Sequence, residues 1–293
     1  TCTRNKHVEG LSCGFEVIIG NGFDLDLGWE TSFRDFFQAK HDSFLQYNRL
    51  SYIQQMIDGE YWYNLEGYLR QCILEVELSD VIFLNDFWKI CSNFMLDYFA
   101  QNLPNFKTNH NSCAYHLMKA LSNSIIYTFN YTNPFTKENV TEPEIHFVHG
   151  KFKGATNGAQ MKLGVDTAAL QKNDLAKDDL LKPLIKSDAN TEKDGLIWQL
   201  KKSDNIIIYG HSLSITDSDY FKLFFEYVAS NRLASKSIYF VVYDSRGLQL
   251  VKNNMNEYGI SFDELQLSQN EINIVYTSKG PEDCAFKQML EIV

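Results

Sequence analysis

The stretch EVIIGNGFDLDLG, residues Glu16–Gly28, joins a short apolar run to a glycine-rich turn. A continuous apolar run that ends in glycine is typical of a buried strand, because a strand covered on both faces has no solvent-facing positions. The turn Gly20-Asn21-Gly22 follows directly, and glycine allows a tight passage from a strand into a helix. This stretch therefore predicts the first strand and first turn of an α/β fold.

Five further runs have the same character, namely Ser124–Asn130, Ile145–Val148, Asn205–Tyr209, Ser237–Tyr243 and Ile272–Tyr276. Amphipathic helical patterns separate several of these runs, including Asp217–Leu233 and Ser245–Tyr258. Strands that alternate with helices form a mostly parallel sheet. The sequence thus predicts a Rossmann-like, doubly wound α/β fold.

A long segment between the first two strands, Thr31–Leu121, is rich in aromatic residues and poor in Pro and Gly. Its aromatic residues recur at three-to-four spacing, which is typical of amphipathic helices. We therefore predict one α/β domain over residues 15–293 with a helical insertion at 31–121. Residues 1–14 are expected to lie outside the fold, and Lys151–Lys202 is expected to be loop plus helices.

The charge balance limits the classes of partner. The chain has 293 residues, 37 of them acidic and 27 basic, which gives a formal net charge of −10. A net negative charge opposes a broad hold on nucleic-acid backbones or anionic membranes. Six cysteines occur without a C-x-x-C pair, and no apolar run approaches the roughly 18 residues of a membrane span. We expect a soluble, cytoplasmic protein with reduced thiols, and the sequence indicates no metal site.

Several polar motifs follow the predicted strands. Gly20-Asn21-Gly22 follows the first strand, Thr128–Thr132 (TFNYT) ends the second, and His149-Gly150 follows the third. Ligands of doubly wound sheets bind beyond the carboxyl ends of the strands, so these motifs are expected to converge there. Glycine N–H groups can approach a phosphate, Asn130 can orient a water or sugar hydroxyl, and His149 can accept a proton near neutral pH. Each motif alone also fits a purely structural role in a turn.

The segment Tyr209–Ser214 (YGHSLS) resembles the G-x-S-x-G turn of serine hydrolases, with Ser212 as nucleophile. That interpretation is disfavoured, because position 214 is not glycine and no histidine follows His211 in the chain. Thr216–Asp219 fits a helix-capping pattern that contains Asp217. A second alternative is a glycosidase that uses two of the carboxylates of Asp24, Asp26 and Glu66, whose separation the sequence does not fix.

Together these motifs resemble the AbiH family of bacterial phage abortive-infection proteins. The matching segments, in family order, are IIGNGFDLDLGWETSFRDFF (Ile18–Phe37), WYNLEGYL (Trp62–Leu69), TFNYTN (Thr128–Asn133), HFVHGK (His146–Lys151), LGVD (Leu163–Asp166) and IYGHSLSITDSDYF (Ile208–Phe221). The shared order over most of the chain is far more specific than any single motif.

AbiH proteins are in turn similar to sirtuin-type NAD-binding domains. The sirtuin glycine loop, asparagine motif, H-G pair and G-x-S-L are echoed by Gly20 and Gly22, Asn130, His149-Gly150 and Gly210–Leu213. The resemblance implies that the two glycines approach the NAD phosphates, that Asn130 and His149 flank the nicotinamide ribose, and that Ser212 contacts the adenosine side.

The chain departs from the sirtuin pattern in several places, including the pair Phe33-Arg34, which falls one position out of register from Gly28. Asn21 replaces an alanine, Asp24 replaces a serine, and Thr132 stands where the sirtuin-like aspartate would be. The four-cysteine zinc module is also missing, which disfavours protein deacylation.

The resemblance thus implies a phage-defence effector that binds NAD or a related nucleotide and hydrolyses its nicotinamide N-glycosidic bond. The predicted catalytic residues are His149 and Asn130. The predicted ligand-contacting residues are Gly20, Asn21, Gly22, Phe23, Asp24, Thr31, Gly210, His211, Ser212 and Asp217. The alternative is a non-catalytic nucleotide sensor or interaction protein. A phage-derived trigger and a homo-oligomer are expected partners that the sequence does not identify.

Overall fold

The computed structural model describes residues 15–47, 51–59, 64–122, 124–153, 161–170, 175–186, 192–230, 235–267 and 269–293. The prediction for residues 1–14 lies outside the described residues, as do positions 62 and 63 of the quoted family motif.

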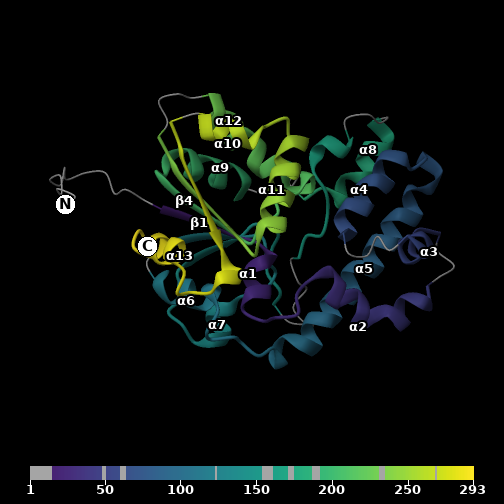
Figure 1. The fold of residues 1–293 in the computed structure, drawn as a ribbon. Helices are drawn as coiled ribbons and strands as arrows, with labels where there is room; N and C mark the ends of the chain where they lie inside the picture. Colours follow the sequence, from purple (N-terminus) through teal and green to yellow (C-terminus); the bar gives the residue numbers. More distant parts are fainter. Residues whose placement is uncertain are drawn as a thin grey trace, which may run out of the picture.

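A parallel sheet forms the centre of the molecule, with strand order β3-β2-β1-β4-β5-β6 (Figure 1). The strands are β1 (Phe15–Ile19), β2 (Ile125–Thr128), β3 (Glu144–Phe147), β4 (Asn205–Tyr209), β5 (Ser237–Val242) and β6 (Glu271–Tyr276). Every neighbouring pair in this order is parallel. Each strand overlaps one of the six predicted runs, and the differences lie at the ends. The predicted doubly wound α/β fold is confirmed.

Helices cover both faces of the sheet, as Figure 1 shows. One face packs against α9 (Glu192–Lys202), α10 (Ser218–Ser230), α11 (Ser245–Glu257) and α12 (Phe262–Leu267), and the other against α1 (Asn21–Asp26), α6 (Cys113–Ala120), α7 (Pro134–Glu138) and α13 (Cys284–Leu290). Along β1, Ile18 belongs to the first core, and Val17 and Ile19 belong to the second. Both faces of the strand are buried, which explains its continuous apolar sequence.

A helical unit lies beside the sheet (Figure 1). It comprises α2 (Phe33–Leu45), α3 (Ser51–Asp58), α4 (Leu65–Glu75), the 3₁₀ turn η2 (Leu78–Asp80) and α5 (Val81–Asn102). These helices bury their own apolar core, in which Phe44 and Phe87 are fully buried. By contrast α6, also within 31–121, packs with the helices on the sheet.

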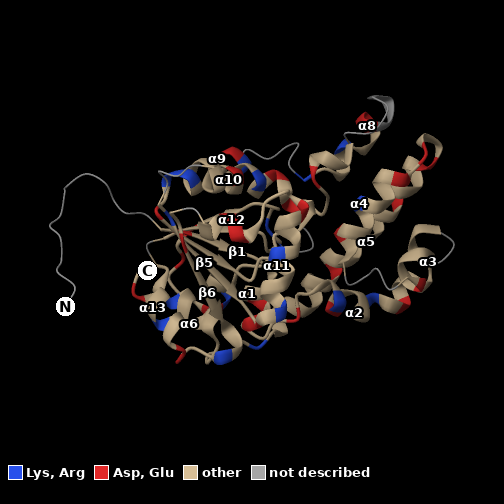
Figure 2. Ribbon diagram, turned by 45° about the horizontal axis from the view of Figure 1, so that its top comes forward, with Lys and Arg blue, Asp and Glu red and all other residues tan. Residues whose placement is uncertain are grey.

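The polar segment after β3 contains short elements among its described residues, namely η4 (Thr167–Leu170), α8 (Leu175–Leu181) and η5 (Lys182–Leu184). Val165 and Ile185 form an isolated parallel bridge, and both belong to the core of the helical unit. The segment therefore adds to the unit formed by α2–α5. Acidic and basic residues are interspersed on the helices that cover the sheet (Figure 2). Within the described ranges, no helix is both long and apolar enough to cross a membrane.

Candidate functional site at the carboxyl edge of the sheet

The strand order places a topological switch point between β1 and β4. The chain runs outward from β1 to β3 on one side and from β4 to β6 on the other, so the loops after β1 and β4 diverge there. The Gly20 N–H donates to the Tyr209 carbonyl at 2.9 Å, and the Gly22 N–H donates to the Gly210 carbonyl at 2.8 Å. Ligands of such folds bind in the crevice at this position.

The glycines at the switch point are required by the close approach of the two loops. A Cβ on Gly22 would lie 2.6 Å from Gly210 Cα, and a Cβ on Gly20 would lie 2.6 Å from His211 Cα. Gly210 itself has a φ of +62°, which L side chains rarely adopt. A phosphate contact through the N–H groups of Gly20 and Gly22 stays a prediction. Such a contact would require these N–H groups to give up their hydrogen bonds to the Tyr209 and Gly210 carbonyls and donate to the phosphate instead.

The loop after β4 is held in an unusual conformation. Leu213 has a φ of +53°, in the left-handed region that bulky residues avoid. The Tyr258 hydroxyl lies within hydrogen-bonding distance of the Leu213 and Ser214 carbonyls, and the Asn254 amide donates to the Ser212 carbonyl at 2.7 Å. Such strain persists only where surrounding contacts fix the backbone, and it is concentrated at functional sites.

Buried charged side chains meet at Asp217, in the 3₁₀ turn η6 (Ile215–Asp217) before α10. Asp217 Oδ1 lies 2.9 Å from Lys186 Nζ and 3.2 Å from His149 Nε2, and Asp217 Oδ2 lies 3.6 Å from His211 Nε2. Lys186 Nζ also lies 2.7 Å from Glu66 Oε2, on α4. The structure thus brings together predicted residues that are far apart in sequence, and it adds Lys186 to them. Glu66, which the sequence indicated only as a carboxylate of the glycosidase alternative, joins them through Lys186.

The protonation states in this cluster follow from burial and neighbouring charge. Burial alone would raise the pKa of Asp217, but Lys186 and the two histidines outweigh it and hold that pKa well below its ordinary value. Burial opposes the charge of Lys186, yet Asp217 and Glu66 raise its pKa above the ordinary value. Burial lowers the pKa of His211 to about 4. His211 is therefore neutral at pH 7, and its proton is on Nε2 because Nδ1 accepts from the Leu213 N–H at 2.9 Å.

His149 packs against aromatic and imidazole rings within this cluster. The Phe129 ring meets His149 edge to face at 4.9 Å and His211 at 4.4 Å between ring centroids. His149 is 3 % exposed. Its Nε2 has no hydrogen bond of good geometry among the described residues. An imidazole beside a carboxylate can take a proton from a bound water or ligand, because the carboxylate stabilises the imidazolium.

Asp24 lies at the same edge, at the ends of β1 and β2. The Thr132 hydroxyl donates to Asp24 Oδ2, and the Asn130 amide donates to the Gly20 carbonyl at 3.1 Å. Burial raises the pKa of Asp24 to about 7, although the Thr132 hydrogen bond favours the charged form. Asp24 Oδ1 is buried without a partner among the described residues. Asp24 therefore titrates near neutral pH beside the predicted catalytic residue Asn130.

Other candidate residues occupy different surroundings. The Thr31 hydroxyl donates to the Asn21 amide oxygen at 2.7 Å, so these two lie together at the start of α1. Phe23 is fully buried in the core and contacts the Tyr209 ring edge to face. Asp26 accepts from the N–H of Ala114 at 2.7 Å, at the start of α6. Phe23 and Asp26 thus contribute to packing and hydrogen bonding on the face of the sheet that α6 and α13 cover.

Lys186, Arg70 and Asp166 were missed by sequence reasoning. Arg70 Nε donates to Asp166 Oδ1 at 2.7 Å, and Asp166 is 1 % exposed. Glu66 and Arg70 are four residues apart on α4, so they share one face of that helix. The available signal was the pair of short apolar segments that carry Asp166 and Lys186, because a charge within an apolar run requires a buried partner.

Residues 77–240, more than half of the chain, match the family described as bacteriophage abortive infection AbiH. This chain belongs to the AbiH family. The matched segment of this AbiH protein includes His149, Lys186, His211 and Asp217. No curated protein and no solved structure matches it. The AbiH resemblance found in the sequence is confirmed.

Proposed function

We propose that this AbiH protein binds NAD or a related nucleotide at the switch point between β1 and β4 and hydrolyses its nicotinamide N-glycosidic bond during abortive infection. The observation that carries the proposal is the burial of His149, whose Nε2 lies 3.2 Å from Asp217 Oδ1 and has no hydrogen bond of good geometry within the described ranges. The sequence resemblance to sirtuin-type domains supports NAD as the nucleotide.

The proposed reaction assigns a role to each of these groups. Water attacks C1 of the nicotinamide ribose while the C1–N bond breaks, and the bonding electrons neutralise the pyridinium nitrogen. The water gives its proton to the imidazole of His149, and the Asp217 carboxylate, 3.2 Å from Nε2, stabilises the imidazolium that forms. Lys186 keeps Asp217 ionised, because it lies 2.9 Å from Asp217 Oδ1. Asn130 orients the water or a ribose hydroxyl. The products are nicotinamide and ADP-ribose.

The test is incubation of the purified protein with NAD, with free nicotinamide followed by proton NMR. General-base catalysis contributes about 10²- to 10⁴-fold, so His149→Ala should lose at least about 100-fold of the rate. His116→Ala, an exposed histidine on α6, is the matched control and should keep the full rate. Thermal shift with NAD checks that His149→Ala still folds and binds. The mechanism is refuted if nicotinamide release is equal in His149→Ala and His116→Ala.

A nucleotide sensor without catalysis is the second candidate. It is favoured by the burial of Asn130 and His149 and by the engagement of the Gly20 and Gly22 N–H groups with carbonyls. A ligand at 100 times its dissociation constant stabilises the folded state by about 2.7 kcal/mol. A rise in melting temperature that corresponds to this stabilisation, without nicotinamide release in the presence or absence of phage lysate, would identify the sensor.

A further inference from the structure

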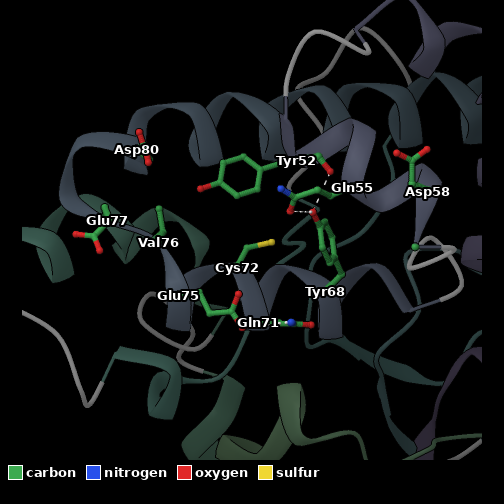
Figure 3. A pocket seen from close by; sticks show the side chains of 11 residues that line it. Tyr52, Gln55, Asp58, Tyr68, Gln71, Cys72, Glu75, Val76, Glu77 and Asp80 are labelled. Carbon is green, nitrogen blue, oxygen red and sulfur yellow. Dashed lines mark hydrogen bonds between the residues drawn. The ribbon is translucent and has the colours of Figure 1, made fainter.

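A cavity of about 580 Å³ lies in the helical unit, away from the sheet edge. It is formed by α3, α4 and the segment through η2, and Figure 3 shows the side chains that line it. Its volume falls in the range of about 300–1,000 Å³ that is typical of small-molecule sites. Neither the family match nor the proposed nucleotide site accounts for this cavity.

The lining of the cavity is acidic and aromatic. Its described lining residues include the four carboxylates of Asp58, Glu75, Glu77 and Asp80, the rings of Tyr52 and Tyr68, and no Lys or Arg. The described residues 51–59 and 64–80 contain a single Lys or Arg, which is Arg70. Arg70 forms an ion pair with Asp166 and does not line the cavity. The cavity therefore favours a cation.

The carboxylates are distributed in a way that suits separated charges. Figure 3 shows Glu77 and Asp80 at one side of the cavity and Asp58 at the other, with the Tyr52 ring and Cys72 between them. A single metal ion requires ligands that converge on one point, whereas these carboxylates lie at opposite sides. A linear molecule with a cationic group at each end and methylenes between them matches this order.

The Tyr52 and Tyr68 rings of the cavity lining can contact both the methylene chain and the ammonium groups of such a molecule. Tyrosine rings contact apolar chains, and their faces attract ammonium groups. The Tyr68 hydroxyl donates to the Tyr52 carbonyl at 3.0 Å, which ties α4 to α3 beside the cavity. The Tyr52 ring also contacts Phe87, with centroids 6.1 Å apart, so its orientation is set by the core.

We propose that the α3–α4 cavity binds a linear aliphatic polyamine, with ammonium groups paired to Asp58 at one side and to Glu77 and Asp80 at the other. The proposal is independent of the nucleotide site and of its chemistry. The cavity would be a second small-molecule site, and it would bind a cation, whereas the proposed nucleotide is an anion.

The test uses isothermal titration calorimetry of the whole protein with spermidine. Butylamine, magnesium chloride and a lysine-rich peptide are the comparison ligands. Spermidine should bind more tightly than butylamine, because only the polyamine reaches both sides, and its affinity should fall with added salt. Equal affinity for butylamine, or binding of magnesium or of the peptide in preference to spermidine, would overturn the proposal.

Charge-neutral variants locate the site. Asp58→Asn and Glu77→Gln change exposed side chains, so the fold is expected to persist and circular dichroism verifies it. Each should weaken spermidine binding by about 2- to 5-fold, the range for one exposed ion pair, and the double variant by about the product of the two. Asp97→Asn, an exposed carboxylate on α5 outside the cavity, is the matched control. Loss of affinity in Asp97→Asn equal to that in the cavity variants would show a general charge effect and refute the site.

Discussion

Replacement of Lys186 by methionine tests the buried ionic cluster directly. Lys186 is 1 % exposed, and its ammonium lies 2.7 Å from Glu66 and 2.9 Å from Asp217. Methionine keeps most of the side-chain volume, so the change removes the charge and leaves little cavity. Loss of one partner from a buried ion pair costs about 3–5 kcal/mol, because the remaining charge is left uncompensated. We expect a loss of that size in the free energy of unfolding at pH 7.

The pH dependence of this loss has a definite sign. In the native protein the pKa of Asp217 lies well below its ordinary value, so its stabilisation is present above that value and is lost as the pH falls through the depressed pKa. Without Lys186, burial raises the pKa of Asp217. Protonation then removes the uncompensated charge, and the cost should fall by about 1.4 kcal/mol for each pH unit below the new pKa.

The measurement is urea unfolding of native protein and variants at pH 7 and pH 5, followed by circular dichroism. Lys89→Met is the matched control, because Lys89 pairs with Asp86 at 3.5 Å on the surface of α5. Such an exposed pair contributes about 0.3–0.5 kcal/mol. The assignment of a buried cluster fails if Lys186→Met costs no more than Lys89→Met, or if its cost grows as the pH falls.

Further predictions concern four separate positions. Burial raises the pKa of Asp24 to about 7, so we expect the native protein to lose up to about 4 kcal/mol of stability as the pH rises from 4 to 7. Asp24→Asn should abolish this pH dependence, which urea unfolding across the range measures. Gly22→Ala should cost about 2–3 kcal/mol, since its Cβ would lie 2.6 Å from Gly210 Cα. Gly195→Ala in α9 should instead stabilise by about 0.5–1 kcal/mol, because its Cβ would have its nearest neighbour at 3.9 Å; opposite shifts in melting temperature check the pair. Ser32→Ala should lose about 1 kcal/mol in thermal unfolding, because Ser32 forms the capping box of α2 with Asp35.

The strands could be predicted from the sequence because each is an uninterrupted apolar run. Burial on both faces of a parallel sheet makes such runs long and distinct, as Asn205–Tyr209 shows. The strand order could not be predicted in the same way, since it depends on where the chain crosses the sheet between β3 and β4. The helices of the insertion were predicted as a group, but the packing of α6 on the sheet depends on contacts far away in sequence, such as the core it shares with Phe286.

The site was predicted in part, for a related reason. Motifs at strand ends indicated His149, His211 and Asp217, because the carboxyl edge of a parallel sheet is where such loops converge. Lys186 belongs to no motif, and the short apolar run before it, Leu184-Ile185, does not show which carboxylate it meets. Its role depends on the bridge between Val165 and Ile185, which carries it into the protein and appears in no local pattern.

The manner in which α4 joins the sheet gives these ion pairs a further meaning. Glu66 and Arg70 lie on one face of α4, and at 100° per residue the cavity-lining Gln71 and Glu75 lie on the opposite face. Apolar residues in place of the pairs with Lys186 and Asp166 would often give similar stability. An ion pair, however, is satisfied in one register only, whereas apolar surfaces tolerate sliding. We infer that the buried pairs fix the position of α4, so that the surroundings of the Asp217 carboxylate beside His149 depend on the placement of the helical unit.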